Sequence, residues 1–244
     1  MKKLLILASC VFILSAFSKT DLQNNLSVDI KTNLSKQLNK AFLNQNSKER
    51  ELLQAVKKGS LRDVKFLVIN GSNINIFEIG TRKTPLHYAA QQRYGAIASY
   101  LISKGADMEA EDLSGETPLF LSLRNFFKEP AFVLIEQGGN VNFISRYGET
   151  PLLVVADSFY DYADIVIALI KKGAKVNYQD PYGKTALHFA VLNKHKAIVK
   201  ILLENGANIN LKDSFGKTPL DYAKTQEIKS LLLEYSTPHI TDSK

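Results

Sequence analysis

The chain has 244 residues, of which 45% are hydrophobic and 23% are charged, and its formal net charge is +7. This composition is ordinary for folded protein and excludes a chain that is disordered throughout. The positive excess is modest and no groove-like run of basic and aromatic residues accompanies it, so we expect no nucleic-acid partner.

Residues 1–18 have the pattern of a secretory signal peptide. A basic start at residues 2–3 precedes an apolar run at 4–17, and residues 16–18 form a small-x-small cleavage site. The apolar run is short for a membrane span, which needs about 20 residues. We predict cleavage before Lys19, with an uncleaved membrane anchor as the alternative.

Cys10 is the only cysteine, and the sequence Leu-Ala-Ser-Cys at 7–10 is similar to the site at which bacterial lipoproteins are cut and acylated. Lipidation of Cys10 is therefore a second way in which the chain could be held at a membrane. If the cut instead falls before Lys19, the mature chain has no thiol and forms no disulfide.

Residues 19–46 are rich in Asn and Gln and carry apolar residues at every fourth position. This spacing indicates an accessory helix that docks on the next segment or serves as a tether, and a flexible polar linker is the alternative. The apolar positions are Leu22, Leu26, Ile30, Leu34, Leu38 and Phe42.

Near-copies of one short motif return along the rest of the chain. Its threonines are spaced by 33, 33, 35 and 33 residues, and a fixed period over most of a chain predicts a repeat architecture. The threonines are Thr84, Thr117, Thr150, Thr185 and Thr218.

Each repeat predicts two helices and a loop. In the first complete repeat, Thr84 is a good N-cap and Pro85 suits the first helical position. A second apolar helix at 97–106 ends near Gly105, because glycine favours the left-handed conformation that closes a helix. Asp, Ser, Pro and Gly residues then predict a turn before the next threonine. The closing glycine recurs as Gly138, Gly173 and Gly206.

Two incomplete repeats flank the complete ones. Residues 49–75 have both helices without the Thr-Pro-Leu start, and residues 225–236 form a shortened second helix. End repeats of a stack need polar outer faces, so these two segments are the predicted caps. The predicted organisation is an N-terminal cap at about 47–80, complete repeats at about 81–113, 114–146, 147–181 and 182–214, a C-terminal cap at 215–236, and a tail at 237–244.

The motifs Thr-Pro-Leu-His at 84–87, Thr-Ala-Leu-His at 185–188 and Gly-Ala-Asn-Ile-Asn at 206–210 resemble those of the ankyrin-repeat family, over about residues 47–236. The resemblance implies an all-α solenoid of about six helix-turn-helix repeats with protruding β-hairpin-like loops. It also implies that His87 and His188 tie one repeat to the next by a hydrogen bond. Members of the family typically hold another macromolecule on the concave face made by the first helices and the loop tips.

Three places depart from the repeat pattern. The loop before Thr84 is one residue longer, with Arg82 where the others have glycine. Pro130 falls near the start of a second helix, and because interior proline costs about 3 kcal/mol, we expect that helix to begin at Pro130, a turn late. The third repeat has two extra residues between its helices, at 157–165, and the aromatic residues there form a contact surface or fold back into the groove.

Candidate partner-binding residues lie on the loop tips and the concave side. Exposed aromatic rings on rigid loops bring large contact area at small entropic cost, although the rings could instead cover neighbouring loops. The loop-tip candidates are Ser114, Arg146, Tyr147, Tyr182 and Phe215. The charged residues before each threonine are Lys83, Glu116, Glu149, Lys184 and Lys217, and the candidates beyond the first helices are Arg124, Asn125, Asp157, Phe159 and Tyr160.

No Gly-rich phosphate loop, nucleophile motif or histidine spacing typical of a metal site occurs in the sequence, so we expect no enzyme activity, no cofactor and no metal. The prediction is a monomeric, non-catalytic protein-binding scaffold exported to a bacterial periplasm. The alternatives are a secreted effector that binds host proteins and a membrane-tethered lipoprotein of the envelope. The partner is another protein, and membrane contact requires lipidation of Cys10 or retention of the signal.

Overall fold

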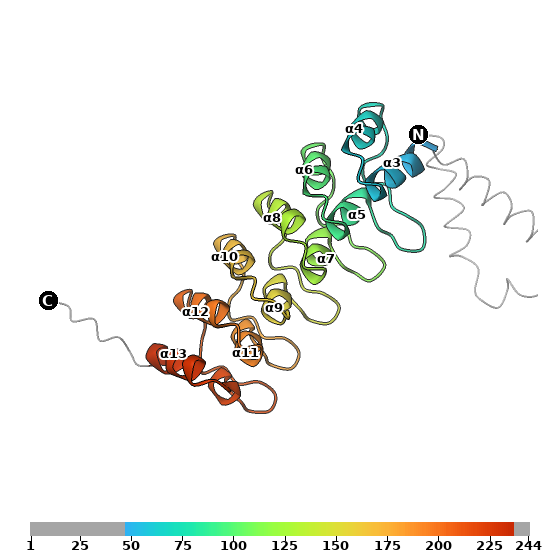
Figure 1. Ribbon diagram of the computed structural model, residues 1–244. Coiled ribbons are helices and arrows are strands. Elements are labelled where there is room, and N and C mark those ends of the chain that lie inside the picture. Colours follow the sequence, from blue (N-terminus) through green and yellow to red (C-terminus); the bar gives the residue numbers. More distant parts are fainter. Residues whose placement is uncertain (1–46, 237–244) are drawn as a thin grey trace, which may run out of the picture. The chain divides into compact units, whose positions relative to one another are not determined.

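The computed structural model describes residues 47–236, which form a stack of six helical pairs (Figure 1). The described residues contain eleven α-helices, one short 3-10 helix and no strand, which confirms the all-helical solenoid. The predicted signal at 1–18, the segment at 19–46 and the tail at 237–244 lie outside the described residues.

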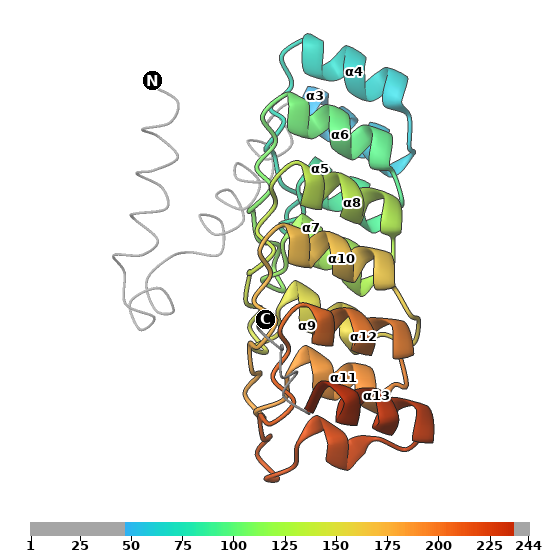
Figure 2. The same ribbon diagram turned by 90° about the vertical axis from the view of Figure 1, so that its left-hand side faces the viewer.

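Each pair consists of a first helix that borders the loops and a second helix that runs back beside it (Figure 2). The pairs are α3 (Ser47–Lys57) with α4 (Leu61–Ile69), α5 (Pro85–Gln91) with α6 (Gly95–Ser103), α7 (Pro118–Arg124) with α8 (Lys128–Glu136), α9 (Pro151–Ala156) with α10 (Ala163–Lys171), α11 (Ala186–Leu192) with α12 (Lys196–Glu204), and η1 (Pro219–Tyr222) with α13 (Gln226–Ser236).

The first helices begin where the repeated threonines predict. The Thr84 hydroxyl accepts a hydrogen bond from the backbone N–H of His87, and Pro85 is the first helical residue. Thr117, Thr150 and Thr185 cap their helices in the same way. Each such cap stabilises its helix by about 1 kcal/mol, so the threonines fix the start of every complete repeat.

The second helices end at the predicted glycines. After α6, Gly105 has φ +87° and donates its N–H to the carbonyl of Ile102, while Ala106 donates to Leu101. A side chain at this φ would strain the backbone, which explains why glycine returns at the same place in the following repeats. The equivalent residues are Gly138, Gly173 and Gly206.

The core lies between the two rows of helices and continues from pair to pair. In the second helices, the leucines at one repeated position are fully buried: Leu101, Leu134, Leu169 and Leu202. In the first helices, an equivalent row is also buried: Leu86, Leu119, Leu152 and Leu187. Because each pair buries its apolar side against its neighbours, stability depends on contacts between adjacent repeats.

The loops before the threonines project on one side of the stack and have hairpin-like hydrogen bonds (Figure 2). In the loop before Thr185, Asp180 donates its N–H to the carbonyl of Lys184 at 2.9 Å, and Gly183 at φ +75° makes the turn. The longer loop before Thr84 closes through the N–H of Glu78 and the carbonyl of Lys83, and Arg82 takes the left-handed conformation at φ +55°.

The prediction that α8 begins late at Pro130 is wrong. The helix begins at Lys128, so Pro130 is its third residue. The first N–H groups of a helix have no partner within the helix, and the first such bond in α8 is donated by Ala131 to Phe127. Proline at the third position therefore removes no hydrogen bond from the helix.

His87 and His188 link neighbouring repeats, as the family resemblance implies. His87 is fully buried, its Nδ1 accepts the N–H of Thr84, and its Nε2 donates to the carbonyl of Glu116 in the next loop. His188 makes the same bonds with Thr185 and Lys217. Both rings are thus structural groups of the stack.

Candidate functional site

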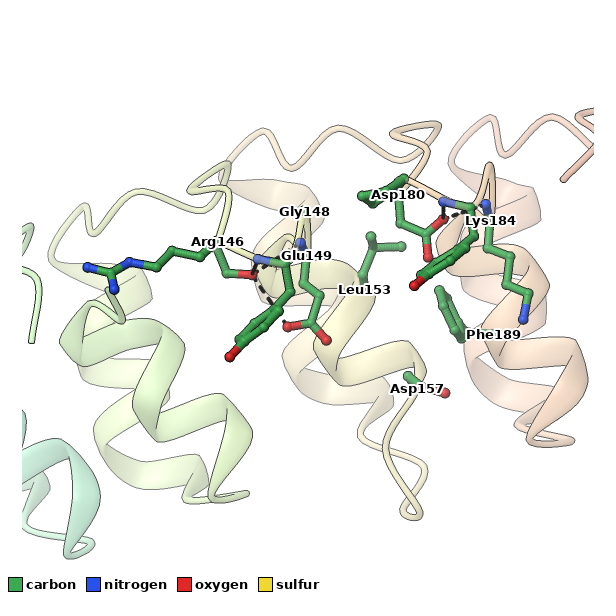
Figure 3. A pocket seen from close by; sticks show the side chains of 12 residues that line it. Arg146, Gly148, Glu149, Leu153, Asp157, Asp180, Lys184 and Phe189 are labelled. Carbon is green, nitrogen blue, oxygen red and sulfur yellow. Dashed lines mark hydrogen bonds between the residues drawn. The ribbon is translucent and has the colours of Figure 1, made fainter. Parts of the chain in front are cut away.

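A groove of about 750 Å³ lies between the third and fourth complete repeats (Figure 3). Two loop tips form its rim, and side chains from α9 and α11 form its floor. The lining residues are Ser145, Arg146, Tyr147, Gly148, Glu149, Leu153, Asp157, Asp180, Pro181, Tyr182, Lys184 and Phe189.

Two exposed tyrosines stand on the rim of this groove. Tyr147 is 73% exposed and Tyr182 is 66% exposed. The backbone under Tyr182 is fixed because the Asp180 carboxylate accepts the N–H groups of Tyr182 and Lys184 at 2.9 and 2.8 Å. The Ser145 hydroxyl accepts the equivalent N–H groups of the loop that carries Tyr147. Both rings are therefore presented by internally bonded loops, which lowers the entropic cost of a contact.

Arg146 belongs to the same rim, but its guanidinium extends away from the groove (Figure 3). Its Nη1 donates to the carbonyl of Leu113 in the preceding loop at 3.2 Å. The side chain also lies against Gly115, where an added Cβ would meet Arg146 Nε at 2.3 Å. Arg146 therefore joins two neighbouring loops.

The floor combines apolar and charged groups. Leu153 is buried, and Lys184 Nζ lies 5.5 Å from the centre of the Phe189 ring. Asp157 lies at the far end of α9, where Asn193 Nδ2 donates to its carboxylate at 3.2 Å. Partial desolvation in the groove raises the pKa of the Asp157 carboxyl, and the bond from Asn193 opposes that rise.

Three of the predicted partner-binding residues form ion pairs with one another within the chain. Arg124 Nε lies 2.7 Å from Glu116 Oε1, and Arg124 Nη2 lies 2.7 Å from Glu149 Oε2. Burial raises the pKa of Glu116, and the Arg124 charge opposes that effect. The three side chains form a chain of ion pairs from the second repeat to the third, beside the groove.

The other predicted residues lie outside the groove. Lys83 donates to Gln91, Lys217 lies 5.3 Å from the Tyr222 ring centre, and Asn125 donates to the carbonyl of Leu121 at the end of α7. Ser114 is exposed and Phe215 is 72% exposed on their own loop tips.

The connection at 157–162 is longer than the equivalent three-residue connections between α5 and α6, α7 and α8, and α11 and α12. Its rings divide between two environments. Phe159 is 93% exposed. Tyr160 is 61% exposed, yet its ring and that of Tyr162 contact Phe126 of the preceding repeat, with ring centres 6.0 and 5.8 Å away. On the other side, His195 Nε2 donates to the carbonyl of Ser158 at 2.8 Å. The connection is thus held from both sides while Phe159 projects outward.

Leu153 and Phe189 were not among the predicted binding residues, although they form the apolar floor. Leu153 stands where His87 and His188 stand in their repeats, but this departure from the motif gave no clear signal, because Phe120 departs at the same position outside the groove. Phe189 gave no signal either, because aromatic residues at its position also occur as Tyr88 and Tyr222, outside the groove.

Residues 47–236 contain no group of three His, Cys, Asp or Glu side chains arranged to hold a metal ion. In this same part of the chain, no helix is both long and apolar enough to cross a membrane. The groove combines two exposed rings, apolar side chains on its floor and charges of both signs.

We expect His87→Leu to show that His87 stabilises the stack in its neutral form. Burial lowers the pKa of His87, so below about pH 6.5 the unfolded chain binds more protons than the folded chain and folding weakens. His87→Leu removes this contribution of the His87 side chain to the pH dependence of folding. The difference in urea midpoint between the unchanged chain and His87→Leu should therefore be larger at pH 7 than at pH 5.

Phe120→Leu is the matched control, because Phe120 occupies the same position in the next repeat and does not titrate. The midpoint difference for that variant should stay constant over the same pH range. A constant difference for His87→Leu as well would contradict the assignment of a depressed pKa to His87.

The fold of residues 47–236 is that of a helical repeat protein. Comparison with known families agrees: the profile of ankyrin repeats in three copies matches residues 52–142, 128–213 and 156–242. The chain belongs to the ankyrin repeat family, whose repeats are protein–protein interaction modules.

Similar proteins come from bacteria and animals. An ankyrin repeat domain from Acinetobacter baumannii AYE is 29% identical with a TM-score of 0.70, and the match covers 75% of this chain and 96% of that one. A chain from the complex of a predatory endopeptidase of Bdellovibrio bacteriovorus with an immunity protein is 30% identical with a TM-score of 0.65, covering 75% and 97%. Ankyrin repeat domain-containing protein 40 of Mus musculus is 34% identical over 84 residues. This match covers 34% of this chain and only 23% of that protein.

Proposed function

We propose that this chain is a monomeric, non-catalytic scaffold that binds another protein in the groove between its third and fourth complete repeats. The observation that carries the proposal is the pair of exposed tyrosines, Tyr147 and Tyr182, on internally bonded loops at the rim of a groove of about 750 Å³. Rigid aromatic anchors beside a pocket are the usual centres of binding energy in protein interfaces.

The proposed site of action is the periplasm of a bacterium. The support is the basic, apolar and small-residue pattern of residues 1–18. A secreted effector that binds host proteins and an envelope lipoprotein acylated at Cys10 are the alternatives. Mass spectrometry of the N-terminus tests the lipoprotein alternative, because a chain beginning at Lys19 excludes acylation at Cys10. Immunodetection in the periplasmic and culture-medium fractions tests the secreted alternative.

An exported hydrolase is a second candidate for the partner class. One solved chain that matches 75% of this sequence was crystallised in a complex of an endopeptidase with an immunity protein. The test should therefore include enzymes that the same cell exports.

The proposal is tested by capture from the native envelope fraction, followed by an affinity measurement with the captured protein. We expect Tyr182→Ala to weaken binding about tenfold, because it removes an anchor worth about 1.4 kcal/mol. Tyr147→Ala should have a similar effect. Circular dichroism establishes that both variants remain folded.

Phe77→Ala is the matched control, since Phe77 is a half-exposed ring on the first loop, outside the groove. Its affinity should equal that of the unchanged chain. If Phe215→Ala weakens binding as strongly as Tyr182→Ala, the site is the whole row of loop tips. If neither tyrosine matters, the groove is not the site.

A further inference from the structure

The groove between the third and fourth complete repeats is acidic, although the whole chain carries a formal net charge of +7. Four carboxylates lie in the groove or beside it: Glu116, Glu149, Asp157 and Asp180. Two cations lie with them, Arg124 and Lys184. Even with Arg146, whose guanidinium is bound to the preceding loop, the carboxylates remain in excess.

The two cations are directed toward other partners. Arg124 is shared by Glu116 and Glu149, at 2.7 Å from each carboxylate, so this group of three keeps one negative charge. The side chain of Lys184 extends away from Glu149 (Figure 3). Its Nζ lies 5.5 and 5.9 Å from the centres of two rings, which are those of Phe189 and Tyr222.

Asp157 is the groove carboxylate that lacks a cationic partner. Its carboxylate accepts a hydrogen bond from the neutral amide of Asn193, and no lysine or arginine within residues 47–236 forms an ion pair with it. Partial burial is the main cause that raises the pKa of the Asp157 carboxyl, against the lowering effects of Asn193 and Lys184. The charges of Glu149 and Asp180 raise this pKa further. A cation bound at Asp157 would therefore meet an unbalanced negative charge.

Above this floor, the walls of the groove are apolar. The exposed rings of Tyr147 and Tyr182 stand on the rim, and Leu153 is buried below them. The six residues of α9 extend about 9 Å from the rim toward Asp157. A long side chain with an apolar stem and a charged end matches this order of surfaces, whereas a short side chain stays at the rim.

We infer that the groove receives an arginine side chain of the partner protein, with its stem between Tyr147 and Tyr182 and its guanidinium at Asp157. This inference rests on the proposed function, because it names the group that the partner inserts. Arginine suits the groove better than lysine for two reasons. Its guanidinium is less strongly hydrated than an ammonium group, and its planar fork donates to carboxylates and stacks on aromatic rings.

A titration of the full chain with a capped Gly-Arg-Gly peptide, followed by amide NMR, tests the inference. We expect a Kd of about 1 mM or somewhat weaker, with the largest shifts at the amides of Tyr147, Asp157 and Tyr182. The same peptide with citrulline in place of arginine has nearly the same shape without the charge, and it should bind at least about fivefold more weakly.

Asp157→Asn should weaken binding of the arginine peptide about fivefold, because it removes the charge and keeps the shape. Asp161→Asn is the matched control, since Asp161 is an exposed acid on the same connection and does not line the groove. At about 0.15 M salt, charges more than about 8 Å apart are largely screened, so this control should leave the affinity unchanged. Circular dichroism establishes that both variants remain folded.

Several outcomes overturn the inference: no binding of the arginine peptide, equal binding of the citrulline peptide, or equal losses in Asp157→Asn and Asp161→Asn. Equal affinity for Gly-Lys-Gly overturns the choice of arginine. The captured partner separates this inference from the proposed function. If Tyr182→Ala weakens its binding and Asp157→Asn does not, the proposed function stands and the arginine is wrong. If neither substitution matters, both are wrong.

Discussion

His188→Leu is expected to lower the free energy of unfolding by about 3 kcal/mol at pH 7. His188 is fully buried, and its Nδ1 accepts the N–H of Thr185, a residue that is 1% exposed. Leucine cannot accept this bond, so a buried N–H loses its partner. The bond from His188 Nε2 to the Lys217 carbonyl, which joins the fourth repeat to the C-terminal cap, is lost as well.

Urea denaturation followed by circular dichroism measures this effect. Phe120→Leu is again the control, because it changes side-chain volume at the same repeat position without removing a hydrogen bond, and it should cost about 1 kcal/mol. If the two substitutions cost the same, the bonds of His188 contribute nothing beyond packing.

The helices were predictable from the sequence because their signals are local. A threonine followed by proline fixes a helix start within three residues, and a glycine at positive φ fixes a helix end. The error at Pro130 has a local cause too. Proline is tolerated throughout the first turn, so its position alone leaves the start of α8 uncertain by two residues.

The candidate site was less predictable than the helices, because it depends on contacts between side chains of neighbouring repeats. Arg124 was predicted to face a partner, yet it pairs with Glu116 and Glu149, and the second of these belongs to the next repeat. The two extra residues near position 160 could be counted from the repeat spacing. Which ring is most exposed could not be predicted, because Tyr160 and Tyr162 contact Phe126 of the preceding repeat while Phe159 has the largest exposed fraction.

The ion pairs around Arg124 bear on the proposed function. Glu149 lines the groove, and its bond to Arg124 draws its carboxylate toward the second repeat. Lys184, on the opposite side, lies over Phe189 and Tyr222. The charges of the groove are therefore already engaged within the chain, so we expect the rings to supply most of the binding energy and the charges to set orientation.

Leu169→Ala is expected to cost about 3 to 4 kcal/mol and to divide the unfolding transition into two. Leu169 is fully buried in α10, which packs against α8, α9 and α12. A repeat stack is held by contacts between neighbours, so a cavity in a central repeat weakens the connection between its two halves. Urea unfolding followed by both circular dichroism and hydrogen exchange should place the earlier transition in residues around α9 and α10.

Leu232→Ala makes a similar cavity at the C-terminal end, because Leu232 is 1% exposed in α13. An end repeat can unfold without breaking the stack, so this variant should lose protection in α13 while α9 and α11 stay protected. In Leu232→Ala, the groove between the third and fourth repeats should then bind its partner with unchanged affinity. Leu169→Ala should weaken binding at the urea concentration where its first transition begins. Identical unfolding profiles for the two variants would show that the stack unfolds as one unit and would contradict the predicted division of the transition at α10.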